Sequence, residues 1–92
     1  MVIIEWDPSK AARNHRKHGV SFHEAASIVG DPLAITYDDP EHSVQERRVV
    51  TMGLSNAKRI LIVAHADRAL NVRIISARKT TLRERELYEE KD

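Results

Sequence analysis

The first third of the chain reads as a short strand followed by two helices. Residues 2–6 are mostly apolar and predict the strand. Asp7 and Pro8 then predict the start of a helix, because aspartate caps helix N-termini and proline is favoured at the first helical position. This helix is expected to end at Gly19, since a glycine after a cationic last turn is a common stop signal.

A second helix is predicted from Ser21, where Ser21 and Glu24 form the pattern of a capping box. It is expected to end in the turn at residues 30–32, which contains glycine and proline. Apolar side chains at helical spacing give this helix a core face: Phe22, Ala25, Ala26 and Val29.

The rest of the chain predicts four strands and a last helix. The strands are expected at residues 33–37, 47–54, 59–65 and 72–77, separated by turn-forming segments. Thr81 and Glu84 form a second capping box, which opens a helix to about Glu90. The order predicts an α+β fold: an N-terminal strand and two helices, a four-stranded antiparallel meander, and a C-terminal helix. With 92 residues, we expect a single domain over residues 1–92.

Composition narrows the class of protein. The chain is 41% hydrophobic and 32% charged, which is typical of a globular domain. The longest uncharged apolar run, residues 60–64, is far shorter than the roughly 20 residues that span a bilayer. The first residues lack the basic start and apolar stretch of a signal peptide, and cysteine is absent. We therefore expect a cytoplasmic protein without membrane segments, disulfides or thiolate chemistry.

Charge is segregated along the chain, although the formal net charge is only +1. Residues 31–46 carry five acids and no base, whereas residues 47–83 carry nine bases, seven of them arginines, and the single acid Asp67. Such a basic stretch suits a polyanion, and the planar donor fork of arginine suits phosphate. The alternative is a solvated, solubilising face.

Strand alternation suggests where the arginines lie. In a meander, Arg47, Arg59 and Arg73 can gather on the less apolar face of adjacent strands, with Arg73, Ile75 and Ala77 sharing one face. Arg73 is the most informative residue, because it interrupts an apolar strand and a buried charge must be paired or hydrated. It either forms a structural ion pair, for example with Glu46, or binds an anion.

A series of motifs runs in order through nearly the whole chain: Glu5-Trp6-Asp7-Pro8, Lys10, Asn14, Lys17-His18-Gly19-Val20-Ser21-Phe22, Asp31-Pro32, His42-Ser43, Glu46-Arg47, Gly53, Ser55, Arg73-Ile74-Ile75-Ser76-Ala77-Arg78-Lys79, Arg83-Glu84 and Tyr88. In this order they resemble the signature of the BrnT toxin family. One departure is the turn at residues 56–58, where we expect a glycine and the chain has none.

The resemblance implies a toxin of a type II toxin–antitoxin pair with a fold like that of RelE ribonucleases. It implies an endoribonuclease that cleaves RNA without metal or cofactor and inhibits translation. The implied partners are RNA and an antitoxin with a ribbon-helix-helix DNA-binding domain. Toxin and antitoxin would form a hetero-oligomer that reaches operator DNA only through the antitoxin.

Metal-free RNA cleavage turns the 2′-hydroxyl against the adjacent phosphorus, so it needs a base, an acid and cations for the charge that develops. We predict phosphate and transition-state contacts from Arg47, Arg73 and Arg78. The candidate proton-transfer groups are Glu46, His42 and Tyr88. The candidate contacts to RNA backbone are Arg59, Lys79, Arg83, Lys17 and His18.

Each of these residues also has a purely structural interpretation. Glu46 can simply pair with an arginine, His42 can order a turn, and Tyr88 can pack the last helix. Lys17 and His18 suit a helix C-terminus. A metal site on His15 and His18 lacks a third ligand at a supportive spacing. The whole basic stretch could also belong to a non-catalytic nucleic-acid-binding module or to a scaffold that docks a partner.

Overall fold

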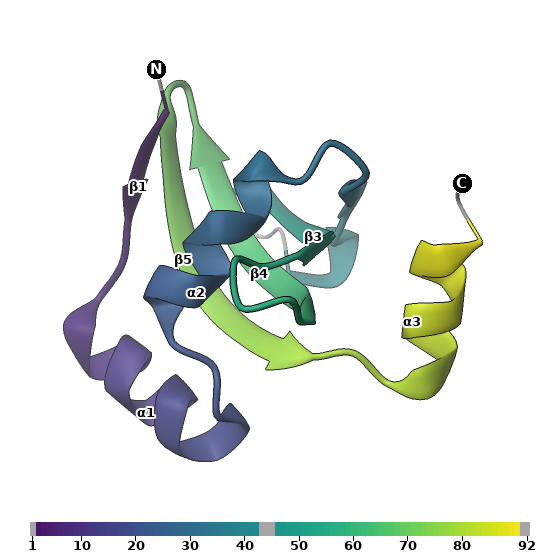
Figure 1. Cartoon of the computed structure of the whole chain (residues 1–92). Coiled ribbons are helices and arrows are strands. Elements are labelled where there is room, and N and C mark those ends of the chain that lie inside the picture. The colour runs from purple at the N-terminus through teal and green to yellow at the C-terminus, as the bar shows by residue number, and fades with distance from the viewer. Residues whose placement is uncertain (1, 43–45, 91–92) are drawn as a thin grey trace.

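The structure, a computed structural model, describes residues 2–42 and 46–90 (Figure 1). Within these residues the chain forms an α+β fold with three α-helices and a five-stranded sheet, which confirms the predicted fold class. The elements are β1 (Ile3–Glu5), α1 (Pro8–His18), α2 (Phe22–Ala26), the 3-10 helix η1 (Ser27–Gly30), β2 (Ile35–Asp38), the 3-10 helix η2 (Pro40–His42), β3 (Arg48–Leu54), β4 (Ile60–Arg68), β5 (Asn71–Lys79) and α3 (Leu82–Glu89).

The sheet has the order β1-β5-β4-β3-β2. Strands β2 to β5 pair antiparallel with their neighbours, and β1 adds a fifth strand parallel to β5. The predicted four-stranded sheet was therefore one strand short. The N–H of Ile3 donates to the carbonyl of Leu70 over 2.8 Å, which docks β1 at the edge of the sheet. Three residues carry too little pattern to reveal such a distant pairing.

Helix α1 begins and ends as the sequence predicts. The Asp7 side chain accepts from the N–H of Ser9 over 2.8 Å, and Gly19 takes the left-handed conformation at φ 70°. Inside the helix, Asn14 is buried and pins α1 to β5. Its amide donates to the carbonyls of Val20 and Ala77 over 3.0 and 2.8 Å, and its oxygen accepts from the N–H of Ala77 over 3.1 Å.

Helix α2 is shorter than the sequence predicts. Ser21 caps it, accepting from the N–H of Glu24 over 3.0 Å, but after Ala26 the chain tightens into η1. A 3-10 helix has three residues per turn instead of 3.6, so the side chains rotate out of the expected register. As a result Ile28 is buried, whereas Val29, predicted to face the core, is 69% exposed.

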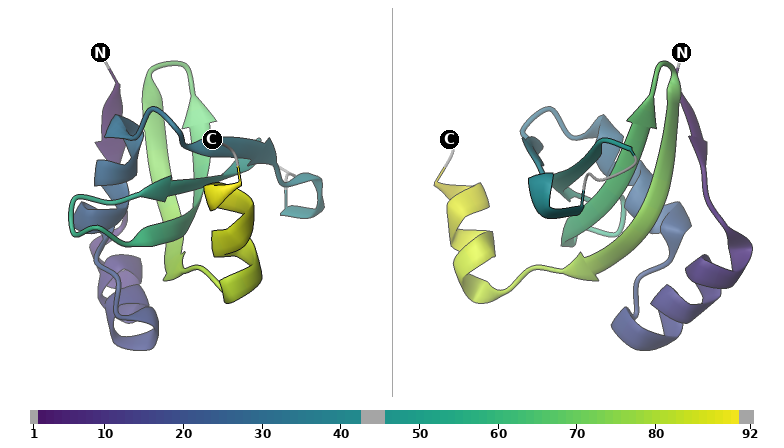
Figure 2. Two further views of the ribbon diagram at one scale, coloured as in Figure 1. Left: turned by 45° about the vertical axis from the view of Figure 1, so that its right-hand side comes forward. Right: turned by 180° about the vertical axis from the view of Figure 1, so that it is seen from behind.

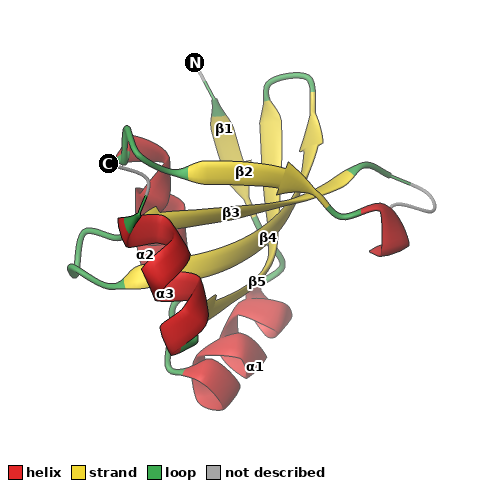
Figure 3. Ribbon diagram, turned by 90° about the vertical axis from the view of Figure 1, so that its right-hand side faces the viewer, coloured by secondary structure: helices red, strands yellow, loops and turns green. Residues whose placement is uncertain are grey.

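The core lies between one face of the sheet and the layer of α1, α2 and η1 (Figure 1). Its buried side chains are Val20, Phe22, Ala25, Ile28, Leu61, Val63, Ile74 and Ala77. Helix α3 lies on the other side of the sheet, across one end of β3 and β4 (Figures 2 and 3). Among the described helices, none has the length and apolar character to cross a membrane.

Candidate functional site

The predicted gathering of Arg47, Arg59 and Arg73 on one face is wrong, because Arg59 reaches the helical layer. These three arginines and Arg78 bind four different carboxylates. Arg47 donates to Asp38 over 2.8 Å, and Arg78 donates to Glu84 over 2.8 Å. The two other pairs join Arg59 to Glu24 and Arg73 to Glu46. Arg59 and Arg73 line two different pockets, and neither of these pockets is lined by Arg47 or Arg78.

The backbone explains why Arg59 and Arg73 lie apart. Arg59 alternates with Leu61, whose face of the sheet meets the helices, so its guanidinium reaches Glu24 on α2 and the carbonyl of Gly19. Arg73 lies before a register shift in the β4–β5 ladder, where His65 pairs with Ile74 and Ala64 pairs with Ser76. The extra residue puts Arg73 on the face opposite Ala77, which corrects the prediction that they share one.

The paired residues divide between two ends of the sheet. The end that contains the β4–β5 turn carries a cluster that we call the Glu46 site: Glu5, Glu46, Ala66, Arg68, Asn71 and Arg73, which line a cavity of about 190 Å³. Glu46 accepts from Arg68 over 3.1 Å and from Arg73. The hydrogen bond from Arg68 is the largest effect and lowers the pKa of Glu46. Burial, the next largest effect, opposes it, and the charge of Arg73 lowers the pKa further. One ionised carboxylate and two guanidiniums thus meet at one small cavity.

Two further predicted site residues, Arg47 and His42, belong to segments next to this end of the sheet. Arg48 stands level with Ala66, and Ala66 stands level with Arg73, so the three form a row across β3, β4 and β5. Arg47 immediately precedes this row, with 70% of its side chain exposed. His42 ends η2 on the neighbouring segment, but its side chain lies outside the described residues.

The opposite end of the sheet carries the α3 groove, a cleft of about 610 Å³ between α3 and the β3–β4 turn. Three predicted site residues line it: Arg59, Lys79 and Tyr88. The other lining residues are Leu54, Lys58, Ile60, Thr80, Thr81, Leu82, Arg85 and Glu89. Arg83 is exposed on α3 and is not part of this lining.

Polar contacts attach α3 to the sheet. Arg78 holds Glu84 through two hydrogen bonds of 2.8 Å, and these bonds lower the pKa of Glu84 to about 2. Glu84 also completes the predicted capping box with Thr81. At the other end of α3, the hydroxyl of Tyr88 donates to Asp31 over 2.5 Å. The contacts therefore give Arg78 and Tyr88 an anchoring role.

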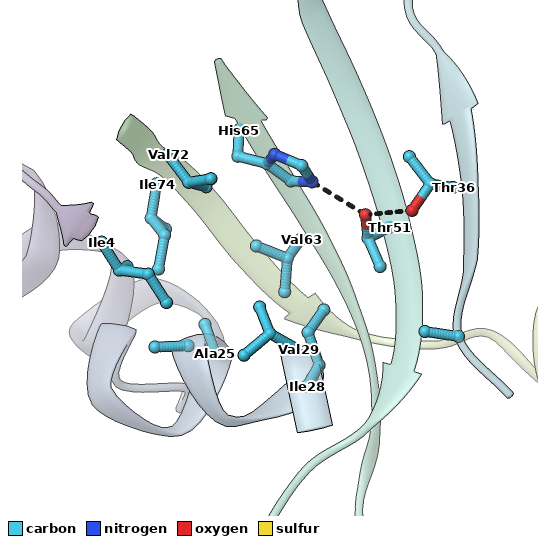
Figure 4. Close-up of a pocket in the computed structure, with 12 residues that line it drawn as sticks. Ile4, Ala25, Ile28, Val29, Thr36, Thr51, Val63, His65, Val72 and Ile74 are labelled. Atoms are coloured by element: carbon cyan, nitrogen blue, oxygen red, sulfur yellow. Dashed lines mark hydrogen bonds between the residues drawn. The ribbon is translucent and has the colours of Figure 1, made fainter. Parts of the chain in front are cut away.

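A histidine that the sequence analysis did not single out lies on the helix-facing side of the sheet (Figure 4). His65 Nδ1 lies 2.7 Å from Asp67 Oδ1, and His65 Nε2 lies 2.8 Å from the Thr51 hydroxyl. Thr51 is in turn 2.7 Å from Thr36. This row of hydrogen bonds links β2, β3 and β4. Its members Thr36, Thr51 and His65 line an apolar pocket of about 240 Å³. The sequence signal that could have indicated this contact is the two-residue spacing of His65 and Asp67, which places both side chains on one face of a strand.

Comparison with known proteins decides the family. A family model described as the ribonuclease toxin BrnT of type II toxin–antitoxin systems matches residues 6–84. The chain belongs to the BrnT family. Among solved structures it is similar to the ribonuclease toxin BrnT of Brucella abortus, with a TM-score of 0.68 and 21% sequence identity over 88% of this chain and 99% of that one. No curated protein matches the sequence.

Membership of the BrnT family implies an RNA substrate and a cognate antitoxin. Several motif residues on which the resemblance rests hold the BrnT fold together. Asn14 joins α1 to β5, and the Ser55 hydroxyl donates to Glu24 over 2.7 Å. A Cβ added to Gly53 would lie 3.1 Å from that of Ile28 and 3.3 Å from that of Ala34, so this position favours glycine.

Two residues predicted to bind RNA, Lys17 and His18, lie in the last turn of α1. That turn belongs to the helical layer behind the sheet, away from the Glu46 site (Figures 1 and 3). His15 lies in the same turn, and the described residues contain no group of three His, Asp or Glu side chains suited to hold a metal ion.

Proposed function

We propose that this BrnT-family protein is an endoribonuclease toxin that cleaves RNA at the Glu46 site. The observation that carries the proposal is the shared carboxylate: Glu46 lies between Arg68 and Arg73 beside a cavity of about 190 Å³. The site thus combines a proton acceptor with two cations. These are the base and the positive charge that RNA cleavage by the 2′-hydroxyl needs, in addition to an acid for the leaving oxygen.

In the proposed reaction, a phosphate of RNA binds Arg68 and Arg73 and replaces Glu46 as their hydrogen-bond acceptor. Glu46 then takes the proton of the adjacent 2′-hydroxyl, and the freed oxygen attacks the phosphorus. The O2′–P bond forms as the P–O5′ bond breaks. The leaving 5′-oxygen takes up a proton, so the products end in a 2′,3′-cyclic phosphate and a 5′-hydroxyl.

The electrostatics of Glu46 suit this order of events. The hydrogen bond from Arg68 is the largest cause of its lowered pKa, followed by burial in the opposite sense and by the charge of Arg73. At neutral pH the side chain is therefore ionised and ready to accept a proton. When a phosphate engages the arginines, their hold on Glu46 weakens and its pKa rises, which makes it a stronger base.

The other predicted site residues take supporting roles in this proposal. Arg47, exposed near the same end of the sheet, contacts a neighbouring phosphate, and His42 is the proposed acid for the leaving oxygen. Contacts to the RNA backbone come from Arg59, Lys79, Arg83, Lys17 and His18. The contacts of Arg78 and Tyr88 support anchoring of α3, so catalytic roles for these two residues stay predictions.

We further propose that cleavage needs no metal ion and that it inhibits translation. The 2′-hydroxyl supplies the nucleophile and the arginines supply the positive charge, so the mechanism has no step that calls for a metal. The proposed antitoxin carries a ribbon-helix-helix DNA-binding domain and brings the complex to operator DNA. The relation of the fold to RelE ribonucleases belongs to the same proposal.

The test is cleavage of a defined RNA by the purified protein and its Arg73→Ala variant. We expect the variant to lose at least about 10²-fold in kcat, as expected for removal of a donor that stabilises transition-state charge. Arg13→Ala, on the exposed surface of α1, is the matched control and should cleave normally. A chelator should leave the rate unchanged.

The products separate the proposal from its alternatives. Fragments with cyclic phosphate ends support it. Tight, salt-dependent RNA binding that leaves the RNA intact would instead favour a non-catalytic nucleic-acid-binding module. Equal cleavage by the wild type and by Arg73→Ala would remove the Glu46 site from the mechanism.

A further inference from the structure

Helix α3 is bound to the sheet without a core of its own. None of its residues from Leu82 to Glu89 is buried. Two sets of hydrogen bonds hold it: Arg78 donates to Glu84, and Tyr88 donates to Asp31. Eight-residue helices are marginal in water, and most helices gain stability by packing an apolar face. Helix α3 therefore keeps apolar side chains exposed to solvent, whereas most helices bury such side chains.

The open surface faces the α3 groove. Leu82, Arg85 and Tyr88 follow one another at three-residue spacing and all line the groove, so one side of the helix forms its wall. Leu54 and Ile60 provide apolar surface across from them. Leu82 is 75% exposed and Leu54 is 36% exposed.

Cations surround this apolar strip. Lys58 and Lys79 both line the groove, and within the described part of the chain no ion pair joins either of them. Glu89 is the one acid of the lining, and it lies 3.5 Å from Arg85. The lining of the groove therefore combines apolar side chains with a surplus of positive charge.

We propose that the α3 groove binds an acidic amphipathic segment of the antitoxin. The inference rests on the proposed function, which supplies the partner, and it adds the surface and the chemistry of the contact. Leucine-like side chains of such a segment would cover Leu54, Ile60 and Leu82, and its carboxylates would meet Lys58 and Lys79. RNA backbone at Lys79 and Arg59 would meet the cations of the groove but would leave the apolar strip uncovered, so an amphipathic segment suits the whole groove better.

A charge series at Leu82 tests the proposal. Lysine, glutamine and glutamate are all good helix formers, and position 82 is exposed, so Leu82→Lys, Leu82→Gln and Leu82→Glu should fold alike. The probe is the purified product of the reading frame next to the toxin gene, titrated at low salt against toxin inactivated by Arg73→Ala. We expect Kd to rise from lysine through glutamine to glutamate, with about 10-fold or more between the ends of the series.

Two controls locate the effect. Lys58→Gln should raise Kd severalfold, because it removes one cation from the lining of the groove. Val29→Glu adds an acid at an equally exposed apolar residue on the helical layer and should leave Kd within twofold. A flat Leu82 series, a reversed order, or a neighbouring product that fails to bind the toxin would overturn the proposal.

RNA cleavage is measured separately on the same Leu82 variants with Arg73 intact. If these proteins never cleave RNA while the Kd series holds, the proposed activity fails and the docking surface stands. If Leu82→Glu weakens RNA binding and leaves the antitoxin affinity unchanged, the groove is an RNA surface and the docking proposal fails.

Discussion

Both ends of the sheet carry arginine–carboxylate ion pairs, but the surroundings of these pairs differ. At the α3 end, Glu84 takes two hydrogen bonds from Arg78 and further ones within the capping box, so every contact serves to hold the helix. At the Glu46 end, one carboxylate is divided between Arg68 and Arg73 beside an open cavity. An arginine–carboxylate pair therefore says little by itself. The number of cations per carboxylate and the space beside them separate an anchor from a candidate site.

The largest expected effect tests the Glu46 end. Glu46→Gln removes the proposed base while keeping the shape of the side chain, and we expect kcat for RNA cleavage to fall by about 10²–10⁴-fold. The matched change is Glu24→Gln, which breaks the pair with Arg59 and should lower stability without lowering kcat. Equal losses in both variants would mean that the two carboxylates do not differ in function.

The second prediction concerns the α3 end and its dependence on pH. The hydrogen bonds from Arg78, opposed by burial and aided by the contacts with Thr81, lower the pKa of Glu84 from 4.5 to about 2 in the folded protein. Because the folded pKa is below the unfolded one, this stabilisation is fully present above about pH 4.5 and is lost as the pH falls towards 2. The loss should reach up to about 3 kcal/mol, since one pKa unit corresponds to about 1.4 kcal/mol.

Urea unfolding of the wild type and of Glu84→Gln between pH 7 and pH 2 measures this dependence. The variant should be less stable at pH 7 and should show a smaller decline in acid. Parallel curves for the two proteins would show that Glu84 does not anchor α3.

Much of the fold could be predicted because its signals are local. The start and stop of α1 depend on Asp7 and Gly19, and the start of α3 depends on Thr81 and Glu84, all within a few residues of the helix ends. The candidate site depends on distant contacts. Glu46 and Arg73 were both singled out, but sequence alone left open whether they pair.

Two of the wrong predictions share a physical cause, which is an irregularity of the backbone. The register shift next to His65 reverses the face of Arg73 relative to Ala77, and the tightening after Ala26 replaces Val29 by Ile28 in the core. Strict period-2 and period-3.6 patterns contain no signal for either event. The wrong prediction for Arg59 has a different cause. Arg59 was expected on the less apolar face, but it lies on the apolar face with Leu61, where Glu24 neutralises its charge.

A smaller effect is expected for Tyr88, which was predicted as a candidate proton-transfer group and whose hydroxyl donates a hydrogen bond to Asp31. Tyr88→Phe removes this hydrogen bond and should lower the free energy of unfolding by about 1–2 kcal/mol. Burial raises the pKa of Asp31, but hydrogen bonds from Tyr88 and two backbone N–H groups outweigh it, so the variant should raise the pKa of Asp31. NMR titration measures that shift, and a loss of kcat beyond the change in stability would restore a catalytic role for the tyrosine.

The smallest effect compares the two turns that close the ends of the sheet. Lys58 in the β3–β4 turn and Ala69 in the β4–β5 turn have positive φ, at 64° and 50°, where glycine is favoured. The positive φ of Lys58 explains why a glycine was expected in the turn at residues 56–58. The left-handed conformation costs other residues roughly 1–2 kcal/mol, and the greater freedom of unfolded glycine offsets part of that cost. Lys58→Gly and Ala69→Gly should therefore each stabilise the protein by about 0.5–1 kcal/mol in thermal or urea unfolding.

The same two variants should differ in binding. Lys58→Gly also removes a cation from the α3 groove, so it should weaken the antitoxin complex while it stabilises the free toxin. Ala69→Gly relieves the same kind of strain at the Glu46 end and removes no charge, so antitoxin affinity should be preserved. If both variants weakened the complex equally, backbone conformation and not the charge of Lys58 would govern docking, and the distinction between the two ends would lose its electrostatic basis.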